Sequence, residues 1–209
     1  MNFQHDMHLP FGNLKILNAE KLSAGKKVLS FIEEFIDVII IPLSGSLVYK
    51  DSLSNKAMIE TNQIGVFSVQ EGMAYELVNV SESAEADFVQ LWLKSDGDFF
   101  MRQSRQQELN LPKMNSLVPV FANKSSNTAD LKINNDACCF MGVYNQNKLE
   151  SYNLKNSENG LFIFVLDGKF KFQSNLVQAR ERISLTENSV VDFQLVSSQG
   201  SFLLLEIPL

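Results

Sequence analysis

Histidine is almost absent from this 209-residue chain. Its two histidines, His5 and His8, lie within the first eight residues, so residues 9–209 contain no imidazole. Imidazole is a common ligand for zinc, copper and non-haem iron in proteins. A transition-metal centre in the body of the chain would therefore depend on carboxylates and thiols. We interpret His5 and His8 as solvent-exposed, because a two-histidine site near a chain end holds a metal only weakly.

Cysteine is scarce as well, and its only two copies are neighbours, Cys138 and Cys139. Adjacent cysteines rarely form a structural disulfide, and no second pair is present, so the sequence predicts a reducing, cytoplasmic environment. No histidine stands nearby in the sequence to activate a thiol. We therefore expect both cysteines to be buried, small apolar side chains rather than catalytic groups.

Long apolar runs and basic clusters are also missing. The apolar run over residues 38–43 is far too short to cross a bilayer, and the N-terminus shows no signal-peptide pattern, so we expect no membrane partner. Lysine and arginine number 18 against 24 aspartates and glutamates, which gives a net charge of −6. Because phosphate backbones bind lysine and arginine, nucleic acid is not expected as a partner either.

What the chain does contain is a globular composition arranged as short β-strand patterns. Hydrophobic residues make up 45% and phenylalanine occurs 16 times, which is enough for a sizeable core. Runs rich in β-branched and aromatic residues alternate with turn residues, and this spacing predicts a sandwich or barrel. The predicted strands are 14–17, 27–30, 37–42, 46–50, 56–60, 64–69, 74–80, 88–94, 137–144, 148–154, 161–166, 169–173, 178–183, 189–195 and 201–207.

The polar middle of the chain divides these strands into two groups. Residues 95–130 are rich in glutamine, asparagine and serine, and they predict a connector with a helical turn near 99–108. The segment around Gly45 resembles the segment around Gly168, since each reads as a strand, a glycine turn and an alternating strand. We expect Gly45 to form a hairpin turn, where a positive φ costs glycine little. The domains expected are 1–95, a connector over 96–130, and 131–209.

Several short motifs carry a resemblance to a known family. They are Phe-Gly-Asn-Leu-Lys-Ile-Leu-Asn at 11–18, Lys-Asp-Ser-Leu-Ser-Asn at 50–55, Gly-Met-Ala-Tyr at 72–75, Leu-Trp-Leu at 91–93 and Leu-Leu-Leu-Glu-Ile-Pro at 203–208. Together they resemble the pirin-like bicupins, which include pirin and quercetin 2,3-dioxygenase-like proteins. The likeness covers nearly the whole chain. It implies an all-β fold of two cupin barrels (double-stranded β-helix, jelly-roll) in tandem.

The resemblance also implies where a metal would bind. In the family, the first barrel holds a metal through three histidines and a glutamate, some members cleave flavonols such as quercetin with O₂, and animal pirin is described as a nuclear cofactor of transcription factors. Aligned on Asp37 and Gly72, the four ligand positions fall on Phe31, Glu33, Tyr75 and Leu77. None of the four matches, so we expect a lost metal site and no cofactor.

Two interpretations of the first barrel follow. In one, Phe31 and Leu77 fill the former metal cavity, and Glu33 and Tyr75 are hydrogen-bonded at its mouth. In the other, Glu33 and Tyr75 form an oxygen site that binds a metal ion, with His5 and His8 folded near it, or that carries metal-free proton transfer. Strand alternation places Glu33 and Asp37 on one face. The expected pocket residues are Phe31, Glu33, Asp37, Tyr75, Leu77 and Trp92.

The function expected from the sequence is that of a pirin-like bicupin without the metal-dependent dioxygenase activity of its relatives. Such a protein would bind a small apolar molecule in the first barrel, or it would act as an interaction module with a protein partner. The alternative is a divergent enzyme, dioxygenase-like or isomerase-like, in which Glu33 acts as base and Tyr75 as acid.

Overall fold

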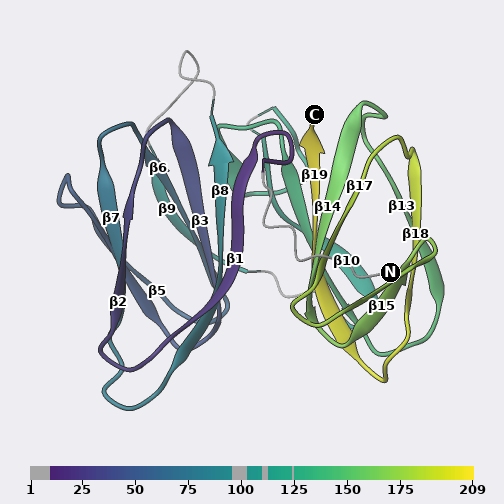
Figure 1. Cartoon of the computed structure of the whole chain (residues 1–209), viewed down its shortest axis with the longest axis horizontal. Coiled ribbons are helices and arrows are strands. Elements are labelled where there is room, and N and C mark those ends of the chain that lie inside the picture. The colour runs from purple at the N-terminus through teal and green to yellow at the C-terminus, as the bar shows by residue number, and fades with distance from the viewer. Residues whose placement is uncertain (1–9, 96–102, 110–112, 124) are drawn as a thin grey trace.

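The chain folds into two β-barrels that lie side by side (Figure 1). A computed structural model describes residues 10–95, 103–109, 113–123 and 125–209, and these residues form strands β1 to β19 without a helix. The expected all-β fold of two cupin barrels is confirmed. Within the described segments there is accordingly no helix long and apolar enough to span a membrane.

The first barrel packs a five-stranded sheet, in the order β1-β8-β3-β6-β9, against a four-stranded sheet, β2-β7-β4-β5. Its core lies between these sheets and includes Val38, Ile40, Phe67 and Leu77. Its strands are β1 (Leu14–Leu22), β2 (Lys27–Phe31), β3 (Ile36–Ser44), β4 (Leu47–Asp51), β5 (Lys56–Ile59), β6 (Gln63–Val69), β7 (Ala74–Asn79), β8 (Ala86–Lys94) and β9 (Ser104–Glu108).

The second barrel repeats this plan with a six-stranded sheet, β11-β10-β12-β19-β14-β17, and a four-stranded sheet, β13-β18-β15-β16. Aromatic side chains fill much of its core, where the rings of Phe170, Phe172, Phe193 and Phe202 pack in stacked, tilted and edge-to-face contacts. Its strands are β10 (Ser116–Asn123), β11 (Lys132–Ile133), β12 (Cys138–Tyr144), β13 (Leu149–Asn153), β14 (Asn159–Asp167), β15 (Lys169–Phe172), β16 (Asn175–Gln178), β17 (Arg182–Leu185), β18 (Val190–Leu195) and β19 (Gly200–Pro208).

The two repeated glycines mark corners rather than paired hairpins. Gly45 joins β3 to β4 and Gly168 joins β14 to β15, and in each case the two strands belong to opposite sheets of their barrel. Both glycines have a positive φ, 75° and 78°. A Cβ at Gly168 would collide with the backbone oxygen of Gln199, so only glycine fits this corner. The repeat seen in the sequence is therefore a repeated sheet-to-sheet turn.

The polar middle of the chain carries two strands. β9 pairs with β6 at the edge of the first barrel, and β10 pairs with β12 in the second barrel. The helical turn expected near 99–108 is therefore wrong where it overlaps β9. Polar residues suit β9 because it is an edge strand whose side chains are mostly exposed.

An apolar layer joins the barrels. Successive residues of β3 point to opposite faces, so Val38 and Ile40 enter the first barrel while Ile39 and Ile41 face the second barrel. There they pack with side chains such as Met141 of β12. Because both faces of β3 are covered, the strand reads as a continuous apolar run in the sequence.

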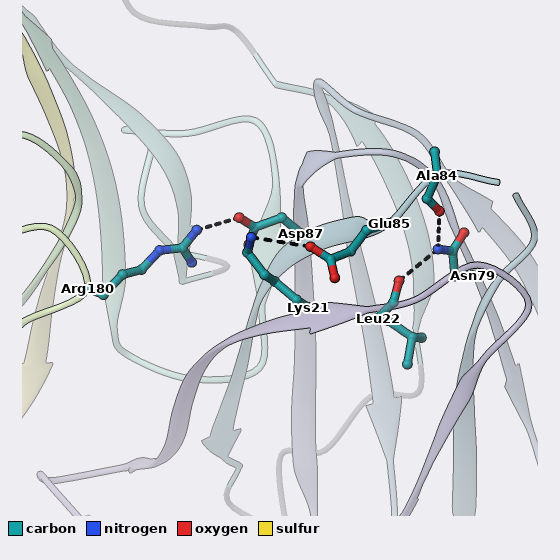
Figure 2. Close-up of polar contacts among 7 residues, drawn as sticks. All are labelled: Lys21, Leu22, Asn79, Ala84, Glu85, Asp87 and Arg180. Atoms are coloured by element: carbon teal, nitrogen blue, oxygen red, sulfur yellow. Dashed lines mark hydrogen bonds and ion pairs between the residues drawn. The ribbon is translucent and has the colours of Figure 1, made fainter.

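Polar contacts close the rim of this interface (Figure 2). Arg180, in the turn before β17, forms an ion pair with Asp87 of β8 and so links the second barrel to the first. Beside it, Lys21 pairs with Glu85 at 3.2 Å. Asn79 donates from Nδ2 to the backbone oxygens of Leu22 and Ala84, both at 2.8 Å, which fixes the loop before β8.

Candidate functional site

Phe31 and Glu33 do not line the first barrel. Phe31 is 71% exposed at the end of β2, and Glu33 is exposed in the bend that follows. The inward positions of β2 are Val28 and Ser30, which lie opposite Leu77 and Tyr75 of β7. The prediction that Phe31 fills the cavity and that Glu33 is hydrogen-bonded at its mouth is therefore wrong. The even-numbered residues of β2 point into the barrel, so Phe31 points outward. His5 and His8 lie outside the described residues.

Asp37 was also expected in this pocket, but it faces the second barrel. Its carboxylate is fully buried and accepts hydrogen bonds from Ser68 Oγ at 2.7 Å and from the backbone N of Asn134 at 2.6 Å. The Asn134 side-chain Nδ2 donates to it at 3.0 Å. Asn134 follows β11, so Asp37 joins the two barrels. The expected shared face with Glu33 fails because Glu33 lies in a bend rather than in a strand.

Tyr75, Leu77 and Trp92 do belong to the interior of the first barrel. Leu77 is fully buried, and the Tyr75 hydroxyl accepts hydrogen bonds from Gln90 Nε2 and Trp92 Nε1, both at 2.7 Å. Burial raises the pKa of the Tyr75 phenol well above its usual value, although the hydrogen bonds that the oxygen accepts oppose this shift. Tyr75 is thus a neutral hydrogen-bonding centre at neutral pH.

Aromatic rings occupy the space beside this centre. Tyr49 stacks on Phe67 with ring centroids 3.7 Å apart, and on Tyr75 at 5.4 Å; all three side chains are buried. The side chains at the family's four ligand positions do not fit a metal ion. Phe31 and Leu77 are hydrocarbons, Tyr75 is a phenol, and the one carboxylate, that of Glu33, is exposed. Among the described residues, no group of three or more histidine, cysteine, aspartate or glutamate side chains could hold one.

Replacing Tyr75 with phenylalanine should lower the free energy of unfolding by about 2 kcal/mol, because two buried N–H groups lose their acceptor. Urea denaturation measures the change. Tyr144→Phe is the matched control: its hydroxyl contacts Glu150, which is still reached by solvent, so a smaller loss is expected. An equal loss in both variants, or none in Tyr75→Phe, would show that the hydrogen bonds to Gln90 and Trp92 are not needed.

A cleft of about 360 Å³ opens at the mouth of the second barrel. Most of the residues that line it are polar, and strands β10, β12, β14 and β19 contribute them together with neighbouring loops. Cys138 of β12 lies directly opposite Glu206 of β19, and both face the barrel interior. The lining residues are Ala122, Asn123, Ser126, Asp136, Cys138, Lys155, Asn156, Asn159, Glu206 and Pro208.

Glu206 organises the floor of this cleft. Its carboxylate is fully buried and accepts hydrogen bonds from the Tyr152 hydroxyl at 2.7 Å and the Asn159 side chain at 2.8 Å. The backbone N–H groups of Lys155 and Asn156 also donate to it, at 3.0 and 3.1 Å. Since these donors hold the loop after β13, Glu206 shapes the cleft rather than offering an open acceptor to a ligand.

Other groups in the cleft retain bonding capacity. Asn123 donates to Asp136 at 3.0 Å, but its own Oδ1 is buried without a partner. The Lys155 ammonium contacts Thr128 Oγ1 at 3.0 Å and lies 5.1 Å from the centre of the Phe140 ring, so it has donors to spare. The wall of the cleft therefore offers a hydrogen-bond donor, the Lys155 ammonium, and a hydrogen-bond acceptor, the amide oxygen of Asn123.

The two cysteines differ in their surroundings. Burial raises the pKa of the Cys138 thiol, an effect that the nearby Lys155 ammonium opposes, and burial raises that of Cys139 further. Both are free and buried, as the sequence predicted. Cys138 touches the cleft, whereas Cys139 packs in the layer between the barrels.

Sequence reasoning missed this cleft. The available signal was a single glutamate, Glu206, inside the apolar run of β19, since a carboxylate there needs several donors brought by the fold. Asn123 and Lys155 carry no pattern that would distinguish them from surface residues.

Known proteins share parts of this sequence and the whole fold. A family model of the quercetinase C-terminal cupin domain matches residues 120–207. The pirin-like protein YhaK of Escherichia coli is 28% identical over 85 residues, which are 41% of this chain and 36% of YhaK, so the match spans about a third of that relative.

Two solved structures resemble the whole chain. The crystal structure of YhaK from Escherichia coli has a TM-score of 0.83 at 17% identity and covers 100% of this chain and 92% of that one. The bacterial pirin YhhW from Escherichia coli, in complex with nickel(II), has a TM-score of 0.82 at 14% identity and covers 100% and 88%. At these identities the likeness establishes the two-barrel fold.

Proposed function

Since the chain belongs to the pirin-like bicupin family, we propose that it is a metal-independent member that binds a small polar molecule at the mouth of its second barrel. The observation that carries this proposal is the cleft of about 360 Å³ with the Asn123 acceptor and the Lys155 donor on its wall. Its volume lies within the range of small-molecule sites. The apolar ligand expected in the first barrel has a poorer case, because aromatic rings occupy that interior.

The ligand chemistry follows from the unused groups. Lys155 offers hydrogen bonds to a carboxylate or carbonyl oxygen, and Asn123 Oδ1 accepts from a hydroxyl or ammonium group. Hydroxy acids and amino acids carry both groups within a few ångströms. We infer a ligand of this class.

The nickel-bound relative YhhW makes metal dependence the natural competing idea. In this chain the four family positions hold Phe31, Glu33, Tyr75 and Leu77, which supply no nitrogen donor and a single carboxylate, on the exposed Glu33. Acid–base chemistry between Glu33 and Tyr75 is not favoured either, since Glu33 is exposed and the Tyr75 hydroxyl is engaged inside the barrel. The two free cysteines support a reducing, cytoplasmic setting.

Lys155→Met is expected to abolish binding of the ligand while leaving the fold intact, because the methionine keeps the apolar stem over Phe140 and the Lys155 backbone N–H still reaches Glu206. A panel of amino acids and hydroxy acids, followed by isothermal titration calorimetry of those that raise the melting temperature, measures this. Lys148→Met, at an exposed lysine in the same barrel, is the control and should bind normally.

Two results would overturn the proposal. One is a panel without a single binder, or binders that Lys155→Met retains at equal affinity. The other is stoichiometric iron, nickel, copper or zinc in the purified protein by elemental analysis, which would reinstate a metal-dependent role.

A further inference from the structure

The cleft at the mouth of the second barrel carries charges of both signs. Among the described residues that line it, the charged side chains are the Lys155 ammonium and the carboxylates of Asp136 and Glu206. One cation against two anions gives this lining a net charge of −1. A ligand that brings another negative charge would increase the imbalance, whereas a ligand without net charge would not.

Glu206 has little capacity left for a ligand. Its carboxylate is fully buried and accepts hydrogen bonds on both oxygens, from two side chains and two backbone N–H groups. These donors within the barrel already stabilise its charge. A cationic group of a ligand therefore has to find its counter-charge elsewhere in the cleft.

Asp136 is the carboxylate that remains available. It is exposed, and its Oδ1 accepts a hydrogen bond from Asn123 Nδ2 at 3.0 Å. No described residue donates to its Oδ2. Beside it, Asn123 Oδ1 is buried without a partner. Within the described part of the chain, two acceptors on neighbouring side chains are thus left for the donors of a ligand.

The number of donors on a ligand decides how well it satisfies these two acceptors. A hydroxyl group has one O–H and can donate to one of them, whereas an ammonium group has three N–H donors and can donate to both. The positive charge of the ammonium is also attracted to the Asp136 carboxylate. This part of the cleft therefore favours an ammonium group over a hydroxyl group.

Lys155 supplies the opposite charge. Its ammonium contacts Thr128 Oγ1 at 3.0 Å, and it forms no ion pair with any described residue. A ligand carboxylate can therefore use its remaining donors without displacing a carboxylate of the protein. The ammonium lies 5.1 Å from the ring centre of Phe140 in β12, and Asp136 comes two residues before that strand, so both charges lie near the start of β12.

We propose that the ligand is an α-amino acid in its zwitterionic form, with its carboxylate at Lys155 and its ammonium at Asp136 and Asn123. This inference rests on the proposed function and narrows it, because hydroxy acids are no longer the preferred class. A zwitterion leaves the net charge of the lining at −1, whereas a hydroxy acid changes it to −2.

Matched pairs of ligands test this choice. The panel that screens for binding contains pairs that differ only in an ammonium or a hydroxyl group, such as L-alanine with L-lactate and L-phenylalanine with L-phenyllactate. In isothermal titration calorimetry at neutral pH, the amino acid that binds should do so at least about fivefold more tightly than its hydroxy acid.

Asp136→Asn separates the charge from the shape of the side chain. The variant should bind the amino acid about fivefold more weakly, because the ammonium loses its counter-charge. It should bind the hydroxy acid no less tightly than the wild type does, because a like charge is removed. A misfolded variant would instead lose both ligands. Glu82→Gln makes the same change of charge in an exposed loop of the first barrel and should leave both affinities unchanged.

The results distinguish this inference from the proposed function. The zwitterion is wrong if hydroxy acids bind as tightly as their amino acids, or if Asp136→Asn keeps full affinity for the amino acid. Binding that Lys155→Met abolishes would still support the proposed function in either case. If neither series binds to the wild-type protein, both are wrong.

Discussion

Glu206→Gln is expected to destabilise the protein by about 3 kcal/mol, one of the two largest effects anticipated for a single change. Every neighbour of the carboxylate is a donor: the Tyr152 hydroxyl, the Asn159 amide and two backbone N–H groups. The amide of glutamine has the same shape, but its own N–H groups would point at these donors. The amide nitrogen would then face groups that now donate to the carboxylate, and the charge-assisted hydrogen bonds of the carboxylate would be lost.

Urea unfolding of the variant and the wild type measures this effect. Glu158→Gln, an exposed residue of the same barrel, is the control and should change stability by less than about 0.5 kcal/mol. Equal stability of Glu206→Gln and the wild type would mean that water or a relaxed loop replaces the network. In that case the floor of the cleft would not be rigid.

The fold was predictable because its signals are local and repeated. Gly45 and Gly168 were placed correctly as turns, since a glycine between two apolar strands is a strong signal for a positive φ. That the turns are corners between sheets was not predictable, because strand pairing depends on residues far away in the sequence. The exposed pattern of β9 likewise reads as a polar loop until its partner β6 is known.

The candidate site was predicted poorly, because the sequence did not show which residues of β2 point into the barrel. Carrying ligand positions over from the family assumed that Phe31 and Glu33 point inward, but β2 ends at Phe31 and the chain bends at Glu33. A strand shifted by one residue presents the opposite set of side chains. Tyr75 and Leu77 were placed correctly because they lie within the regular strand β7, where alternation holds.

The buried polar residues show a further limit of sequence reasoning. Asp37 and Glu206 each stand in an apolar strand, and each finds its donors far along the chain, at Asn134 for the first and at Tyr152 for the second. Only the folded chain brings these groups together. An isolated carboxylate in an apolar strand is therefore best interpreted as the centre of a hydrogen-bond network whose members are still to be found.

Asp37→Ala is expected to cost about 4 kcal/mol of unfolding free energy, because it removes the acceptor that joins the barrels and leaves buried donors on Ser68 and Asn134. Arg180→Met removes a second polar link between the barrels, the ion pair of Arg180 with Asp87 at the rim. That change should cost about 1 kcal/mol, because the Arg180 side chain is 41% exposed and solvent competes for the pair. Chemical denaturation of both variants compares the two links directly.

A double-mutant cycle then separates the contact from the general cost of substitution. Asn134→Ala removes the side-chain donor to Asp37 but keeps the backbone N–H that also bonds to it. The cost of Asp37→Ala should therefore fall by about 1 kcal/mol, not vanish, when Asn134 is already alanine. Additive effects would show that the side chains act independently. A cost for Arg180→Met equal to that for Asp37→Ala would place the main polar link at the rim, where solvent competes, instead of in the buried layer between the barrels.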